Sequence, residues 1–184
     1  MDRAKEKSKY DVCYQDPNYK LGPYRKDHTL NDIKDCIEKY GPFDNHCDVS
    51  AGRGEVIEYV KTFGVSSQGT EIVDDLIKGD VQFAWTHDLP FADEQFDFVT
   101  NCDAIEHYLP EDSDACISEI MRITKKVAYL TISNRPAIKN GVDLHINIKP
   151  YEEWKRILEQ YGQVLQIPFG RRNSTSNSYL VIKK

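Results

Sequence analysis

The sequence predicts an α/β domain with a single doubly wound sheet of seven strands, mostly parallel, with helices on both faces and an antiparallel C-terminal strand pair. Two observations lead to this prediction. Short apolar runs alternate with helical apolar patterns between residues 46 and 132, and strands separated by helices require right-handed crossovers and parallel pairing. The last two apolar runs are joined by a polar connection without a helical pattern, so we expect them to pair antiparallel.

The expected elements follow one another along the chain. An irregular, tyrosine-rich lead-in covers residues 1–27, and a helix extends from Thr29 to the stop signal at Gly41-Pro42. The expected strands are 46–49, 69–73, 81–85, 96–101, 127–132, 163–169 and 178–182. The expected helices between them are 55–63, 111–123 and 152–161. We therefore divide the chain into a lead-in or lid segment, 1–27, and one domain, 28–184.

Composition narrows the classes of function. The formal net charge is -6, which disfavours a nucleic-acid backbone or an anionic membrane as the partner. The five cysteines form no CxxC pair and are expected to be reduced thiols. The N-terminus lacks the apolar core of a signal peptide, and no apolar run approaches the roughly 20 residues of a membrane-spanning helix. We expect a cytoplasmic protein without a membrane span.

The segment from Asp48 to Glu55 lies where a strand becomes a helix. Gly52 and Gly54 permit a sharp turn and a close approach of the backbone to a ligand. On their own, these glycines are equally compatible with a plain tight connection. Glu71 lies at the end of the next strand, where a carboxylate can accept the hydroxyl hydrogens of a ribose. The loop and the acid together predict a cofactor that contains adenosine, either a nicotinamide dinucleotide or S-adenosylmethionine.

Three later segments distinguish between these cofactors. They are His87-Asp88-Leu89-Pro90-Phe91, Phe96-Asp97-Phe98-Val99 and Ile105-Glu106-His107. With them, residues 44–133 resemble the class I S-adenosylmethionine-dependent methyltransferases of the broad type that modifies small metabolites. The resemblance implies a Rossmann-like fold whose sheet ends in an antiparallel strand pair. It also implies methyl transfer from S-adenosylmethionine to a small-molecule, sugar-like or lipid-linked acceptor by in-line displacement.

The resemblance further implies roles for the positions that match the family's motifs. Glu71 would bind the ribose hydroxyls, and Asp88 would accept from the adenine amino group with Leu89 beside the ring. Asp103 would border the sulfonium and the substrate, and Arg25 is a candidate for the cofactor's carboxylate. The full set of expected cofactor-binding residues is Arg25, Asp48, Gly52, Gly54, Glu71, Asp88, Leu89, Cys102 and Asp103.

Methyl transfer from a sulfonium depends mainly on alignment of the acceptor, and removal of its proton is needed only for some acceptors. His107 and His145 are the candidate catalytic bases; alternatively, His107 stacks on the cofactor or caps a helix, and His145 fixes its loop by a backbone hydrogen bond. Glu106 has no second carboxylate at a helical spacing, so no metal is expected. Tyr19 and Tyr24 are candidates for an aromatic lid, or pack as ordinary amphipathic residues.

Other functions fit the sequence less well. Residues 101–104 lack the Asn/Asp-Pro-Pro-aromatic motif with which DNA amino-methyltransferases hold a flipped base, and no Pro-Cys pair supports a cytosine C5 mechanism. A dinucleotide oxidoreductase needs a third glycine where this chain has Ile57. Ser50 stands where the methyltransferase family usually has glycine, so it either adopts a permitted backbone angle or displaces the loop. This departure keeps open the alternative of a catalytically silent methyltransferase-fold protein that binds the cofactor or a partner.

Overall fold

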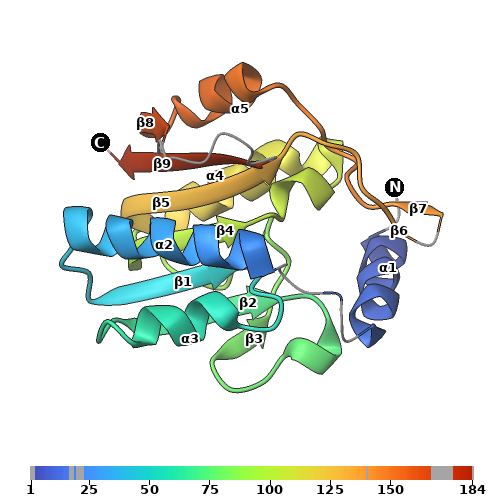
Figure 1. Cartoon of the computed structure of the whole chain (residues 1–184), viewed down its shortest axis with the longest axis horizontal. Coiled ribbons are helices and arrows are strands. Elements are labelled where there is room, and N and C mark those ends of the chain that lie inside the picture. The colour runs from blue at the N-terminus through green and yellow to red at the C-terminus, as the bar shows by residue number, and fades with distance from the viewer. Residues whose placement is uncertain (1–2, 17–18, 20–22, 140, 167–175, 184) are drawn as a thin grey trace.

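A seven-stranded sheet with the order β3-β2-β1-β4-β5-β9-β8 forms the centre of the molecule (Figure 1). The structure is a computed structural model that describes residues 3–16, 19, 23–139, 141–166 and 176–183. The strands of the sheet are β1 (Asn45–Val49), β2 (Ser66–Glu71), β3 (Val81–Phe83), β4 (Phe96–Cys102), β5 (Thr124–Ser133), β8 (Gly162–Gln166) and β9 (Ser176–Lys183).

The pairing of the strands confirms the predicted fold class. β1 pairs in parallel with β2 and β4, β2 with β3, and β4 with β5. β9 is antiparallel both to β5 and to β8, and it lies between them. Nearly every residue of β1 and β4 is buried, as expected for central parallel strands that are covered on both faces.

Four helices cover the two faces of the sheet (Figure 1). On one face lie α2 (Pro23–Tyr40) and α3 (Glu55–Lys61), and on the other lie α4 (Ser113–Ile123) and α5 (Tyr151–Leu158). Each face has its own buried apolar cluster. Phe98 packs with the α2 and α3 side chains, while its neighbour Val99 packs with those of α4 and α5, because successive strand residues point to opposite faces.

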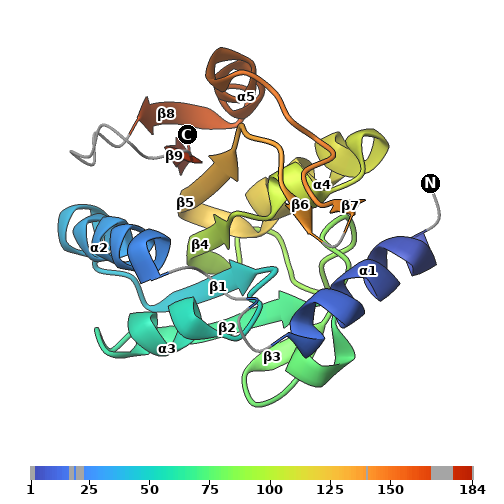
Figure 2. The ribbon, with the colours of Figure 1, turned by 45° about the vertical axis from the view of Figure 1, so that its right-hand side comes forward.

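The lead-in is where the structure departs most from the prediction. Residues 3–15 form a helix, α1 (Arg3–Gln15), and α2 begins at Pro23, so the prediction of an irregular segment through residue 27 is wrong. Cys13 is the buried residue of α1, so the helix has no apolar face that the sequence could reveal. It lies at the carboxyl ends of the parallel strands, away from both faces of the sheet (Figures 1 and 2).

Several short elements lie near α1. β6 (Ile138–Lys139) and β7 (Val142–Asp143) form a two-stranded hairpin beyond β5 (Figure 2). Three single turns of 3-10 helix are η1 (Asp74–Leu76), η2 (Ile105–His107) and η3 (Pro110–Asp112). Among the residues that the structure describes, no helix combines the length and the apolarity that crossing a membrane requires.

Candidate active site

The loop between β1 and α3 takes a sharply turned path. Ser50, Gly52 and Gly54 all have positive φ angles, of 61°, 55° and 77°. A Cβ atom on Gly52 would lie 2.8 Å from the hydroxyl oxygen of Tyr14, so the close approach of Tyr14 requires glycine at this position. The predicted loop is therefore present, and serine occupies the first of its three positions with a positive φ angle.

Ser50 adopts the left-handed backbone angle, although it stands where the methyltransferase family usually has glycine. The Ser50 hydroxyl lies 3.0 Å from the Tyr108 hydroxyl and 3.3 Å from Thr86 Oγ1. Tyr108 also accepts from Asn101 Nδ2 at 2.9 Å and from Thr86 at 3.1 Å. A left-handed angle costs a residue other than glycine about 1–2 kcal/mol. Hydrogen bonds worth about 1 kcal/mol each offset this cost and connect the ends of three strands.

Glu71 ends β2, as predicted, and its carboxylate holds the loop. One oxygen accepts from the Gly52 N–H at 2.8 Å, and the other accepts from the N–H groups of Ile72 at 2.7 Å and Val73 at 3.2 Å. Burial raises the pKa of Glu71, and the three N–H donors act in the opposite direction. An ionised carboxylate offers about four acceptor positions, so one is left for a ribose hydroxyl.

Asp48 lies beneath the same loop. It is buried and accepts a hydrogen bond from Thr100 Oγ1 at 2.6 Å. Burial raises the pKa of Asp48 to about 7; the Thr100 hydrogen bond opposes this shift, and the nearby Glu71 carboxylate adds to it. The charge below the loop therefore changes with pH close to neutrality.

Two adjoining cavities open at the carboxyl ends of the parallel strands. The first, of about 150 Å³, lies beside Glu71. The second, of about 250 Å³, lies beside Gly52 and is also lined by His145. The two cavities belong to one site, because they share the lining residues Tyr14, Tyr19, Ser50, Cys102, Asp103 and His107.

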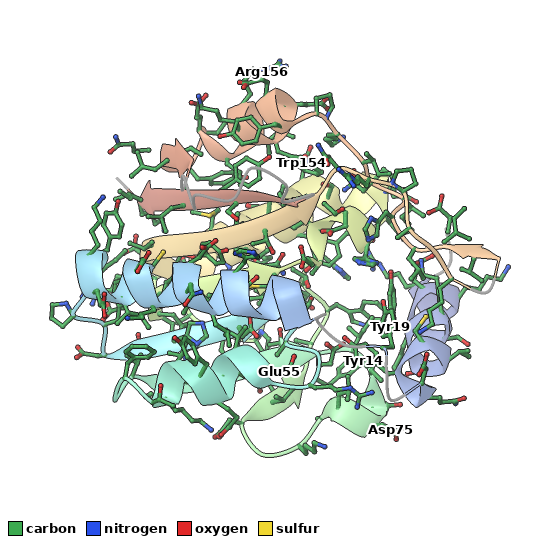
Figure 3. All side chains as sticks on the ribbon, viewed as in Figure 1. Tyr14, Tyr19, Glu55, Asp75, Trp154 and Arg156 are labelled. Atoms are coloured by element: carbon green, nitrogen blue, oxygen red, sulfur yellow. The ribbon has the colours of Figure 1, made fainter. Side chains whose placement is uncertain are left out.

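Tyrosines of the lead-in cover this site. Tyr14 and Tyr19 lie between α1 and the loop before α3 (Figure 3), and their rings meet edge to face at 4.9 Å. The Arg53 guanidinium donates to the carbonyl oxygens of Tyr14 at 3.2 Å and Tyr19 at 3.4 Å, so the loop and the lead-in are joined. Burial raises the pKa of both tyrosines. The side chain of Tyr24, the other candidate for a lid, is outside the described residues.

The two candidate catalytic histidines contact each other. The rings of His107 and His145 are 4.7 Å apart and almost perpendicular, at 84°. His107 Nδ1 is 3.0 Å from the Tyr10 hydroxyl. His145 Nδ1 is 2.5 Å from the Arg135 carbonyl oxygen, which is the backbone hydrogen bond considered from the sequence. The tertiary structure thus combines two separately predicted residues into one imidazole pair on the wall of the second cavity.

Glu106 lies next to this pair and is completely buried. Its Oε1 accepts from the Ser133 N–H at 3.0 Å. Glu106, His107 and His145 each offer one potential metal ligand atom, and these three atoms lie within 4.8 Å of one another. The expectation of no metal rested on the absence of a second carboxylate near Glu106 in the chain, and an imidazole from a distant loop leaves no such local pattern.

Of the other expected cofactor-binding residues, some line the cavities and others do not. Cys102 and Asp103 line both cavities at the end of β4. Asp88 and Leu89 are not among the described residues that line either cavity; Asp88 is exposed, and Leu89 packs in the core with 4% of its surface exposed. A buried Leu89 does not provide the expected surface beside an adenine ring. The side chain of Arg25 lies outside the described residues.

Several residues that line the site were not identified from the sequence. Trp85 lines the first cavity next to His87, with 6.0 Å between the two ring centres. Tyr10 and Tyr14 enter the site from α1, whose polar pattern gave no signal of a helix. Tyr108 follows η2, and its sequence context gave no indication of the three polar groups, those of Ser50, Thr86 and Asn101, that contact its hydroxyl. The second tryptophan of the chain, Trp154, is fully buried.

This combination of features defines a class of protein. The sheet order, the antiparallel β9 and the turned loop followed by an acid at the end of β2 are those of a Rossmann-like methyltransferase fold. Residues 47–132 match the family described as a methyltransferase domain. Residues 47–132 therefore carry a domain of the class I S-adenosylmethionine-dependent methyltransferases, enzymes whose cofactor is S-adenosylmethionine.

Solved structures of similar fold include three methyltransferases. The 1,6-didemethyltoxoflavin-N1-methyltransferase of Burkholderia thailandensis has a TM-score of 0.72 and 15% identity, over 99% of this chain and 89% of that one. An S-adenosylmethionine-dependent methyltransferase of Clostridium acetobutylicum has a TM-score of 0.68 and 13% identity, over 88% of this chain and 92% of that one. The magnesium protoporphyrin IX methyltransferase of Synechocystis with bound S-adenosylhomocysteine has a TM-score of 0.64 and 15% identity, over 90% of this chain and 89% of that one. At identities this low, the structural similarity shows a common fold and does not show a common substrate. No curated protein matches the sequence.

Proposed function

We propose that this chain transfers the methyl group of S-adenosylmethionine to a small-molecule acceptor that binds in the second cavity. The observation that carries the proposal is the junction of the two cavities at Ser50, Cys102 and Asp103. On one side of this junction lies the acid suited to a ribose, on the other lies His145, and His107 lines both cavities. A methyl group held at the junction would face an acceptor directly.

The first cavity suits the adenosine part of the cofactor. Glu71 would accept a ribose hydroxyl at its remaining position, and the aromatic rings of Trp85 and His87 offer flat surfaces for the base. The methionine part would follow the Ser50–Gly54 loop into the near part of the second cavity, with the carboxylate of Asp103 near the positive sulfonium, and the acceptor would lie beyond it towards His145. In this proposal Asp88 stays a candidate for the adenine amino group and Arg25 for the cofactor's carboxylate.

The second cavity suits the acceptor. Methyl transfer requires the attacking atom, the methyl carbon and the sulfur to be in line, so the walls of the cavity mainly align the acceptor. Residues 1–27 would serve as a lid over the methyltransferase domain of residues 28–184, with Tyr14 and Tyr19 excluding water. A large or polyanionic acceptor such as nucleic acid fits poorly with this covered site and with the net charge of -6.

The imidazole pair supplies the group that would take the acceptor's proton. A carbonyl oxygen only accepts hydrogen bonds, so the neutral His145 ring donates through Nδ1 to Arg135 and keeps its lone pair on Nε2. That nitrogen would accept the proton of a hydroxyl or N–H group as the methyl group transfers. His107, in contact with His145, is the second catalytic candidate.

Calorimetry and a transfer assay test the proposal. The protein should bind S-adenosylmethionine and S-adenosylhomocysteine but not NAD, and Glu71→Ala should weaken this binding. Methyl-labelled cofactor should then pass its label to the small-molecule fraction of a cell extract. Binding of NAD alone would refute the proposal, and cofactor binding without transfer to any fraction would support a catalytically silent protein instead.

The histidines have their own test once an acceptor is found. His145→Asn should lower kcat while leaving the affinity for S-adenosylhomocysteine unchanged, because it removes a proton acceptor from the second cavity. Its effect should shrink at high pH, where the acceptor loses its proton without help. His87→Asn is the matched control, since it removes an imidazole from the first cavity and should affect cofactor affinity rather than the pH profile.

A further inference from the structure

We infer that Glu106, His107 and His145 form a binding site for a divalent transition-metal ion on the wall of the second cavity. One ligand atom from each residue lies within 4.8 Å of the other two. Two of the side chains, His107 and His145, line the cavity, and Glu106 lies behind them with no exposed surface. A small inward movement would bring all three atoms to the separations found around a single ion, whose bonds to them are about 2.0–2.2 Å long.

Neighbouring backbone and side-chain groups orient the three side chains. His145 donates through Nδ1 to the Arg135 carbonyl, so Nε2 presents a lone pair. Metal-binding histidines usually have this arrangement, in which the second ring nitrogen donates to a carbonyl or carboxylate. Glu106 accepts from the Ser133 N–H at 3.0 Å, and the Tyr10 hydroxyl lies 3.0 Å from Nδ1 of His107.

The loop of His145 is attached directly to the turn that carries the other two residues. The Asn147 N–H donates to the Glu106 carbonyl at 3.0 Å. The Asn147 side chain donates to the Ile105 carbonyl at 3.3 Å and to Ser113 Oγ at 3.1 Å, and it is buried. The three ligands are therefore held together before any ion binds, which reduces the entropy lost on binding.

The donor set indicates which ions would bind. Two imidazole nitrogens and one carboxylate oxygen are typical ligands of zinc and of other first-row transition metals. Magnesium and calcium prefer sites made of oxygen atoms. Three protein ligands leave positions open towards the second cavity.

Those open positions indicate a class of acceptor, a point that rests on the proposed function. A hydroxyl oxygen bound to the ion would lose its proton to solvent more easily, because the positive charge stabilises the oxyanion. In the metal-bound protein the ion thus replaces His145 Nε2, which is then a ligand, as the group that activates the acceptor. The oxygen lone pair would then form the bond to the methyl carbon while the carbon–sulfur bond breaks and its electron pair stays on sulfur. The site therefore suits acceptors that present a hydroxyl group, giving O-methylation.

The experiment measures binding of metal ions alone to chelator-treated protein. Calorimetry should show one Zn²⁺ or Co²⁺ per chain, bound at least about 100-fold more tightly than Mg²⁺. Glu106→Gln and His145→Asn should each weaken binding at least about 10-fold, the loss common even for groups that only support metal ligands. His87→Asn should leave metal affinity unchanged, since this imidazole lines the other cavity.

A measurement on the unaltered chain covers the case in which a variant fails to fold. X-ray absorption of the zinc-loaded protein should show two imidazole ligands at about 2.0 Å. Absence of Zn²⁺ and Co²⁺ binding, preference for Mg²⁺, or zinc without imidazole ligands would each overturn the inference. Binding of S-adenosylhomocysteine to the metal-free protein is measured in parallel. If it binds and the metals do not, the cation site is refuted and the proposed methyltransferase function stands.

Discussion

The carboxylate of Glu71 accepts a hydrogen bond from the backbone N–H of Gly52 at 2.8 Å. The acid at the end of β2 thus holds the turn of the loop after β1 and at the same time lines the first cavity. Loop shape and, in the proposed function, cofactor binding depend on one side chain, so we expect a change at Glu71 to affect both.

Glu71→Gln should reduce both stability and cofactor affinity. Glutamine has a single acceptor oxygen, so its NH2 group must face either the Gly52 N–H or those of Ile72 and Val73. We expect a loss of about 1–3 kcal/mol in the free energy of unfolding, the cost of leaving a buried donor unpaired. Urea unfolding and calorimetry with S-adenosylhomocysteine measure the two effects. Loss of cofactor affinity at unchanged stability would show that the bond to Gly52 contributes nothing.

Replacement of Ser50 separates its backbone strain from its hydrogen bonds. Ser50→Ala and Ser50→Gly both remove the contacts to Tyr108 and Thr86, but only glycine relieves the left-handed angle of 61°. The glycine variant should therefore be more stable than the alanine variant by about 1 kcal/mol. Urea unfolding provides the comparison. In a Tyr108→Phe background Ser50→Ala should lower the free energy of unfolding by less than it does in the wild type. An equal loss in both backgrounds would show that the hydrogen bond between Ser50 and Tyr108 does not contribute to stability.

Asp48 should make stability depend on pH near neutrality. Burial raises its pKa from 3.8 to about 7, so the folded state binds this proton more tightly than the unfolded state. The contribution of Asp48 to the free energy of unfolding therefore increases as the pH falls from about 8 to about 5. Asp48→Asn removes this dependence and can keep the acceptor for Thr100. The stability of the wild type relative to the variant should rise on acidification, and parallel pH profiles would contradict the assignment.

Helix α1 should exchange its amide hydrogens quickly until the cofactor binds. It is attached by polar contacts such as Arg3 to Asp112 at 3.0 Å and Lys7 to Asp74 at 2.9 Å, and partly exposed ion pairs contribute little to stability. Hydrogen–deuterium exchange should show faster exchange in α1 than in α4, whose residues pack in the core. S-adenosylhomocysteine should slow exchange in α1 and leave α4 as the internal control. An exchange rate in α1 that is the same with and without S-adenosylhomocysteine would rule out a lid.

Local patterns were sufficient for much of the fold and for part of the site. Apolar periodicity along the chain predicted the seven strands of the main sheet but not the β6–β7 hairpin, and the polar connection before β9 predicted its antiparallel pairing. The turned loop and Glu71 followed from glycine chemistry and from the position of an acid at a strand end. These features depend on residues that are close together in the chain.

Other features required the folded chain. Helix α1 has no apolar face, and its partners Asp112 and Asp74 are distant in sequence, so no local pattern reveals the helix or its place over the site. Leu89 carries a family motif but packs in the core. His145 meets His107 only because Asn147 ties its loop to η2. The physical reason is common to all three: the contacts that place these side chains join segments far apart in the chain, and such contacts leave no periodicity in the sequence.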